Sequence, residues 1–299
     1  MALGGNPIFN GKSFRGATQA PSVPQAPYGA PYGQAPYGQQ PYGQPSYGQQ
    51  GWSTQSQGMT DEQLQQMYNQ PSAGPADTGR MTFDDVIMKT AACLGAVLVG
   101  AAITLTVGLG LASLLMIVGA LGGFVLALVN TFKKQPSPAL ILAYAALEGL
   151  FLGGLTRILD TQYPGVGLQA VVGTLSVFAV TLLLFKSGKV RATPKAMRFF
   201  MIALGGYALF SIVNLVMMMT GLTQEPFGLR SGMIGVVIGL LAIGLAAFSL
   251  VMDFTSIEAG VRRGAPQRFS WTAAFGLTVT LVWLYVEIIR LLAILRGDD

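Results

Sequence analysis

The stretch from Thr90 to Val129 contains 40 residues and not one charged side chain. As a continuous α-helix it would be about 60 Å long, roughly twice the ~30 Å thickness of the hydrocarbon core of a bilayer. The stretch therefore predicts two membrane-spanning helices. The glycine-rich segment from Gly108 to Gly110 is the expected break between them.

Five further apolar segments follow this pair. Their expected bounds are Pro138 to Leu159, Val166 to Phe185, Phe199 to Thr220, Ser231 to Asp253 or somewhat beyond, and Ala273 to Leu295. Only 10% of the 299 residues are charged, against about 25% in soluble domains, so the surface must largely face lipid. We expect an all-α, polytopic membrane protein with a seven-helix transmembrane bundle in residues 81–299.

The chain before this bundle has a different composition. From Ala26 to Gly48 a Pro-Tyr-Gly unit recurs, with glutamine between the repeats and almost no aliphatic residue. Ordering such a segment has little apolar burial to offset its entropy. Residues 1–80 are therefore expected to form a disordered cytoplasmic tail, either a solvated spacer or a multivalent surface of tyrosines. A short helix capped by Thr60 is expected over residues 60–68, and no packed contact with the bundle is expected before Thr82.

Lysine and arginine are distributed unevenly over the expected loops. With the N-terminus on the cytoplasmic side, fourteen of the eighteen basic residues fall on that side, as the positive-inside rule requires. The four on the opposite side are Arg157, Arg230, Arg290 and Arg296. The first 25 residues contain no apolar core of a cleavable signal, so the first membrane helix is expected to target the chain. These features predict a multi-pass protein of the cytoplasmic (inner) membrane.

The chain has no histidine, and Cys93 is its one cysteine. A disulfide framework, a zinc site and histidine-dependent nucleophilic catalysis are thereby excluded, so we expect neither an enzyme nor a tightly bound cofactor. The basic residues lie between apolar segments and form no single patch, which argues against nucleic acid as a partner. The expected partner is the lipid bilayer.

Glu148 lies near the middle of an expected span, where an isolated carboxylate costs about 2.5 to 3.5 kcal/mol. It therefore needs a partner or a water-filled cavity. It could serve function, or be a hydrogen-bonded group inside a helix pair brought close by Gly149, Gly153 and Gly154. Arg157 follows nine residues later on the opposite helix face, so it is expected to pair elsewhere or to extend to the interface.

Asp253 and Glu287 lie on the last two expected helices, which are antiparallel and joined by a basic turn. Residues about equally far from that turn meet at one depth, and the two acids are expected to do so as a functional pair. The alternatives are an intrahelical pair of Glu287 with Arg290 and a helix-end position for Asp253. Asn214 could line a polar path, or could form a hydrogen bond between helices.

Several segments resemble the Bax inhibitor-1 family of membrane proteins, which includes bacterial YccA-like members. They are Glu148–Gly149 followed by Leu-Gly-Gly, Tyr163 to Ala170, Ser187 to Thr193, Asp253 to Ile257, and Glu287 to Leu292. The resemblance covers residues 82–297, and the tail before residue 80 lies outside it.

The resemblance implies a seven-helix fold with the last helix at the centre. It also implies a pH-sensitive calcium leak controlled by acids on the last two helices, here Asp253 and Glu287, the second of which is usually aspartate. A shared proton would close this pair, and its loss would expose oxygen ligands that bind calcium weakly. Glu148 would be a secondary acidic site, with accessory roles for Arg157, Arg290 and Asn214.

A second function is also implied by the resemblance. YccA-like members associate with and restrain a membrane-anchored AAA protease. On that reading the chain would be an interaction protein and not a cation leak.

Overall fold

The computed structural model describes residue 65 and residues 79–225 and 227–297. Among these residues, seven helices are long and apolar enough to cross a membrane, which confirms the expected number, and no strand is present. The helices are α3 Phe83–Thr106, α4 Leu109–Phe132, α5 Pro138–Gln162, α6 Val166–Lys186, α7 Pro194–Met219, α8 Gly232–Arg262 and α9 Phe269–Gly297, with a short 3-10 helix, η2 Gly228–Arg230, before α8. The break at Gly108 is confirmed. The expected tail and the helix over 60–68 lie outside the described residues, apart from Gln65 and residues 79–80.

Local signals explain where the helices begin. Thr82 accepts a hydrogen bond from the Asp85 backbone nitrogen at 3.1 Å, and Thr193 accepts one from Ala196 at 3.2 Å. Both are N-caps that satisfy a backbone donor with no partner inside the helix. α5 and α7 begin with Pro138 and Pro194, because proline lacks a donor that the first turn would leave unused.

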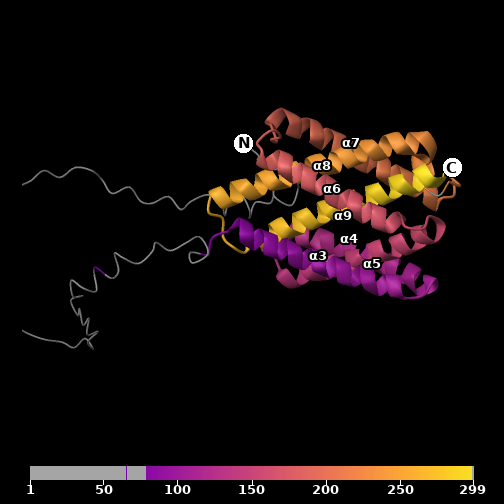
Figure 1. Ribbon diagram of the computed structural model, residues 1–299, viewed down its shortest axis with the longest axis horizontal. Coiled ribbons are helices and arrows are strands. Elements are labelled where there is room, and N and C mark those ends of the chain that lie inside the picture. The colour runs from indigo at the N-terminus through magenta and orange to yellow at the C-terminus, as the bar shows by residue number, and fades with distance from the viewer. Residues whose placement is uncertain (1–64, 66–78, 226, 298–299) are drawn as a thin grey trace, which may run out of the picture. The chain divides into compact units, whose positions relative to one another are not determined.

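The last helix lies at the centre of the bundle, as the resemblance implies. In Figure 1, α9 runs between α6 and α8 on one side and α3, α4 and α5 on the other. In an apolar stretch of 18 residues within α9, 78% is buried inside the protein. In the corresponding stretch of α7, 11% is buried. A side chain on α9 is therefore surrounded by protein, and most side chains on α7 face outward.

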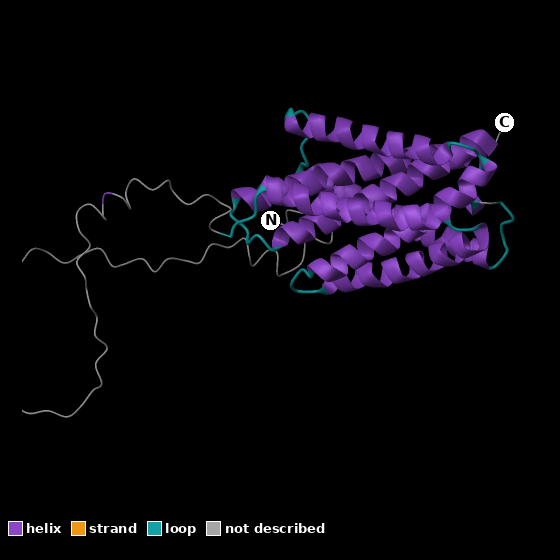
Figure 2. Ribbon diagram, turned by 60° about the horizontal axis from the view of Figure 1, so that its bottom comes forward, coloured by secondary structure: helices purple, strands orange, loops and turns teal. Residues whose placement is uncertain are grey.

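Glycines bring α5 against its two neighbours. A Cβ atom on Gly149 would lie 2.2 Å from the Val97 carbonyl oxygen on α3, and one on Gly154 would lie 2.5 Å from Met116 on α4. The close approach expected at Gly149, Gly153 and Gly154 is thus confirmed. Such contacts hold helices together where lipid removes the hydrophobic driving force. Figure 2 shows the helices side by side, joined by short loops at both ends.

The segment before α3 is attached to the loop between α8 and α9. The Met81 side chain is 1% exposed, and the Met81 backbone nitrogen donates to the Ala265 carbonyl oxygen at 2.7 Å. The Gln267 nitrogen donates to the Gly79 carbonyl oxygen at 2.8 Å. The expectation of no packed contact before Thr82 was wrong, because Met81 supplies an apolar side chain and the backbone of Gly79 and Met81 supplies hydrogen bonds.

Candidate functional site

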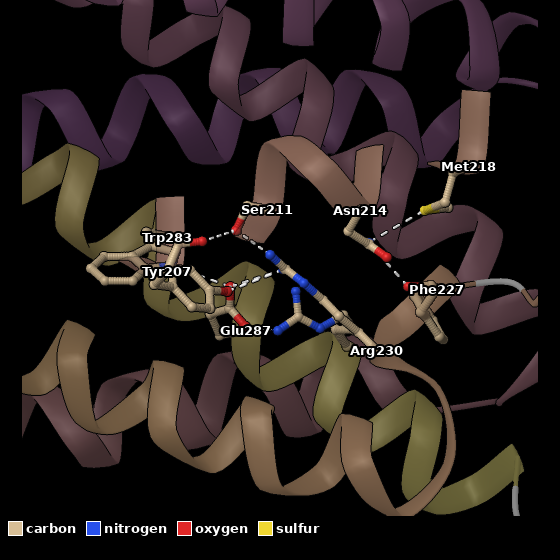
Figure 3. Close-up of polar contacts among 9 residues, drawn as sticks. Tyr207, Ser211, Asn214, Met218, Phe227, Arg230, Trp283 and Glu287 are labelled. Atoms are coloured by element: carbon tan, nitrogen blue, oxygen red, sulfur yellow. Dashed lines mark hydrogen bonds and ion pairs between the residues drawn. The ribbon is translucent and has the colours of Figure 1, made fainter. Parts of the chain in front are cut away.

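Glu287 is the centre of a buried polar cluster. Its carboxylate, 2% exposed, is ion-paired with Arg290 three residues later and accepts a hydrogen bond from Trp283 at 3.2 Å. The Tyr207 hydroxyl on α7 also donates to it, and Arg230 of η2 approaches to 3.9 Å. In Figure 3, the side chains of Tyr207, Arg230 and Trp283 converge on Glu287 from three parts of the chain. The intrahelical pair of Glu287 with Arg290, weighed as an alternative above, is present.

Arg230 connects this cluster to α7. Its guanidinium donates to the Tyr207 hydroxyl at 3.1 Å and to the Ser211 hydroxyl, and it stacks 4.9 Å from the centre of the Tyr207 ring. Arg230 is 7% exposed, and its Nε atom has no hydrogen-bond partner in the described part of the chain. We call Tyr207, Ser211, Arg230, Trp283, Glu287 and Arg290 the arginine cluster. It contains two guanidinium groups and one carboxylate, which fix α7 and η2 to α9.

Asp253 lies elsewhere on the same helix pair. It is completely buried between α8 and α9 and accepts a hydrogen bond from the Thr280 hydroxyl at 2.7 Å. Ser249, one turn earlier on α8, lies 3.5 Å from the same hydroxyl. Asp253 therefore belongs to a short row of polar groups inside an otherwise apolar helix contact.

Asp253 and Glu287 do not lie at one depth. Thr280, the partner of Asp253, precedes Glu287 by seven residues, which is about 10 Å along α9. Asp253 lies nine residues before the end of α8, whereas Glu287 lies 18 residues after the start of α9. The expected equal depth was wrong because the two acids are unequally far from the turn. A proton shared between them, and a calcium ion held by both, are therefore not features of this arrangement.

No group of three or more acidic, cysteine or histidine side chains that could hold a metal ion occurs among the described residues. Glu148 lies on α5 against Gly123, where an added Cβ atom would come within 2.9 Å of its Oε1 atom. The missing side chain at Gly123 therefore makes room for this carboxylate. Glu148 also interacts with the Tyr144 hydroxyl one turn earlier.

Asn214 holds the connection between α7 and α8. Its side chain donates to the Phe227 carbonyl oxygen at 3.2 Å and accepts from the Leu229 nitrogen at 2.7 Å. Gly228 has φ of 61°, and a Cβ atom there would lie 2.5 Å from the Asn214 Oδ1 atom, so glycine is required. These hydrogen bonds join α7 to the η2 segment that follows it, whereas the role weighed above as an alternative was a hydrogen bond between two membrane helices. Arg157 takes part in none of the ion pairs between described residues.

The sequence interpretation missed Arg230, Tyr207, Trp283 and Thr280. Arg230 carried one signal, because it is among the few basic residues expected on the side poor in positive charge. Tyr207 and Thr280 carried none, since an aromatic ring or a threonine in an apolar helix is ordinary.

Comparison with known proteins gives the family. The model for the family described as Bax inhibitor 1 like matches residues 6–297. The match extends far into the segment before residue 80, which the sequence interpretation had placed outside the resemblance. A search of the curated proteins gave no match. Seven apolar helices in the described part of the chain and a match over nearly its whole length show that this chain is a multi-pass membrane protein and belongs to the Bax inhibitor 1 like family.

Proposed function

We propose that the chain is a pH-sensitive leak for calcium or other cations across the cytoplasmic membrane, controlled by the proton on Asp253. The observation that carries this proposal is the complete burial of Asp253 between two helices that can span a membrane. Burying a carboxylate at such a position within the membrane costs free energy, and such residues mark ion or proton pathways. Family membership supports the same reading, since the resemblance implies a leak controlled by an acid at this position.

The proton determines whether the contact between α8 and α9 stays closed. When Asp253 is protonated it is neutral, and it shares hydrogen bonds with Thr280 inside a packed contact. When the proton leaves, a negative charge remains in a region of low dielectric and attracts water and a cation. Flux is therefore expected to rise with pH. One carboxylate supplies at most two of the six to eight oxygen ligands that calcium prefers, so the ion is held weakly and passes on.

Glu287 has a different role in this proposal from the one expected from the sequence. Its charge is balanced by Arg230 and Arg290, so it is not the group that titrates. It serves as the anchor that holds α7 and η2 on the central helix. The gate thus consists of Asp253 and the neighbouring hydroxyls of Thr280 and Ser249. The arginine cluster holds α7 and η2 in place on the same central helix.

The test is calcium flux into liposomes that contain only the purified chain, measured from acidic to alkaline pH. Asp253→Asn keeps the size of the side chain and a hydrogen-bonding oxygen but cannot ionise, so its flux should not change with pH. Glu258→Gln is the matched control, because Glu258 lies on the same helix in ion pairs with Arg191 and Arg262. The control should keep the wild-type pH profile.

A wild-type pH profile in Asp253→Asn would overturn the role of this residue. No flux from the purified chain at any pH would overturn the leak itself. Regulation of a membrane-anchored AAA protease, the other function that the resemblance implies, would then be the leading proposal.

A further inference from the structure

A large apolar crevice lies apart from both acidic sites. It has a volume of about 900 Å³ and is lined by residues of α3, α5, α6 and α9. This size is near the upper end for small-molecule sites. Three of its lining residues, Leu98, Leu168 and Leu175, are between 58% and 72% exposed, so the crevice opens at the side of the bundle that faces the bilayer.

One end of the crevice carries charged side chains, and the rest is mostly apolar. Arg157, Asp160 and Thr161 line it from the last two turns of α5, which ends at Gln162. Leu94 and Val97 line it near the middle of α3, halfway across the bundle. The crevice therefore presents charge at the end of the helices and hydrocarbon toward the membrane centre. This is the profile of an amphiphile with a charged head and a long chain.

The polar groups deeper in the crevice satisfy one another. The Thr156 and Tyr285 hydroxyls are 2.7 Å apart and join α5 to the central helix. Neither hydroxyl therefore needs water, and the wall that they form can accept an apolar chain.

The two charges at the mouth, Arg157 and Asp160, take part in no ion pair with other described residues. The Nε atom of Arg157 is buried without a hydrogen bond, whereas Asp160 is held in place by the Gly165 nitrogen, which donates to it at 2.8 Å. The residues are three apart on one helix and so lie on neighbouring positions of its surface. Together they offer a cation and an anion side by side.

We propose that this crevice binds a phosphatidylethanolamine molecule, with one of its two acyl chains along α3 and α6. Arg157 binds the phosphate, because a guanidinium matches the geometry of phosphate oxygens. Asp160 accepts hydrogen bonds from the primary ammonium group. A phosphatidylglycerol head would leave Asp160 beside a negative charge, and the quaternary ammonium of phosphatidylcholine has no hydrogen to donate.

Native mass spectrometry of the full chain in detergent tests this, with phosphatidylethanolamine, phosphatidylglycerol and phosphatidylcholine of identical chains added in equal amounts. The wild type should retain phosphatidylethanolamine preferentially. Arg157→Gln should weaken its retention about tenfold, the factor expected from one charge-assisted hydrogen bond. Asp160→Asn keeps the acceptor for Gly165 and should abolish the preference for phosphatidylethanolamine over phosphatidylglycerol. Arg263→Gln, which removes an exposed arginine outside the crevice, should change nothing.

A second pair of variants separates the crevice from the general lipid surface. Leu98→Trp places a large ring in the crevice, whereas Leu121→Trp places the same ring on α4 at a position with nearly equal exposure, 65% against 66%. Retention should fall in the first and not in the second. Equal retention of the three lipids by the wild type, or an unchanged preference in Asp160→Asn, would overturn the assignment. Full retention in Leu98→Trp would overturn the crevice as the binding site.

Discussion

At the scale of single residues, the two deeply buried acids of the last helices are stabilised in different ways. Glu287 faces the guanidinium groups of Arg290 and Arg230 and accepts hydrogen bonds from the neutral side chains of Tyr207 and Trp283. The Asp253 carboxylate accepts a hydrogen bond from the neutral hydroxyl of Thr280. A carboxylate next to two guanidinium groups is stabilised in its charged form, and the proposed proton switch is therefore assigned to Asp253 and not to Glu287.

This contrast makes Glu287→Gln a stability variant. The substitution leaves Arg230 and Arg290 buried without a counter-charge, which typically costs about 3 to 5 kcal/mol. Thermal unfolding in detergent should show a large drop in the midpoint. Glu258→Gln, which breaks ion pairs with two partly exposed arginines, should cost less than about 1 kcal/mol. Similar midpoints for the two variants would show that the arginine cluster contributes little to stability.

At the scale of helices, the sequence was sufficient to predict the membrane-spanning segments. It was insufficient to predict which residues of neighbouring helices lie opposite one another. Apolar runs predicted all seven helices, but α7 begins at Pro194, five residues before the expected Phe199. Its first five residues include the charged Lys195 and Arg198 and are capped by Thr193, so hydropathy does not detect them. The prediction that Asp253 and Glu287 lie at equal depth was wrong for a related reason. The positions where α8 ends and α9 begins decide which residues of the two helices lie opposite one another. Arg230 is 57 residues from Glu287, and no local pattern predicts that they meet.

The packing of α5 on α3 depends on one glycine. Gly149→Ala would place a Cβ atom 2.2 Å from the Val97 backbone oxygen, which cannot move without displacing α3. Overpacking of this kind costs about 1 to 3 kcal/mol, and the thermal midpoint should fall accordingly. Gly205→Ala on α7 is the matched control, because nothing lies within 4 Å of its added atom. It should be neutral or slightly stabilising, since alanine favours a helix over glycine. An equal loss in both variants would contradict the close contact.

At the scale of the whole described bundle, an odd number of membrane helices places its two ends on opposite sides of the membrane. The loop after α6, near Lys189, lies at the same end as the start of α3, and the loop after α5, near Gln162, lies at the other. The first loop is rich in lysine and arginine, so we expect it on the cytoplasmic side. Cys93 is completely buried, so a cysteine introduced at an exposed position reports its own accessibility.

Labelling with a membrane-impermeant maleimide tests this orientation. In intact cells Gln162→Cys should react and Lys189→Cys should not, because both positions are exposed but only the first faces outward. Both should react once the cells are permeabilised, which controls for access to the thiol. The reverse pattern in intact cells would invert the bundle and place the charged mouth of the crevice, at Arg157 and Asp160, on the cytoplasmic side. Reaction of both positions in intact cells would contradict the seven-helix crossing itself, since α6 would no longer separate the two loops.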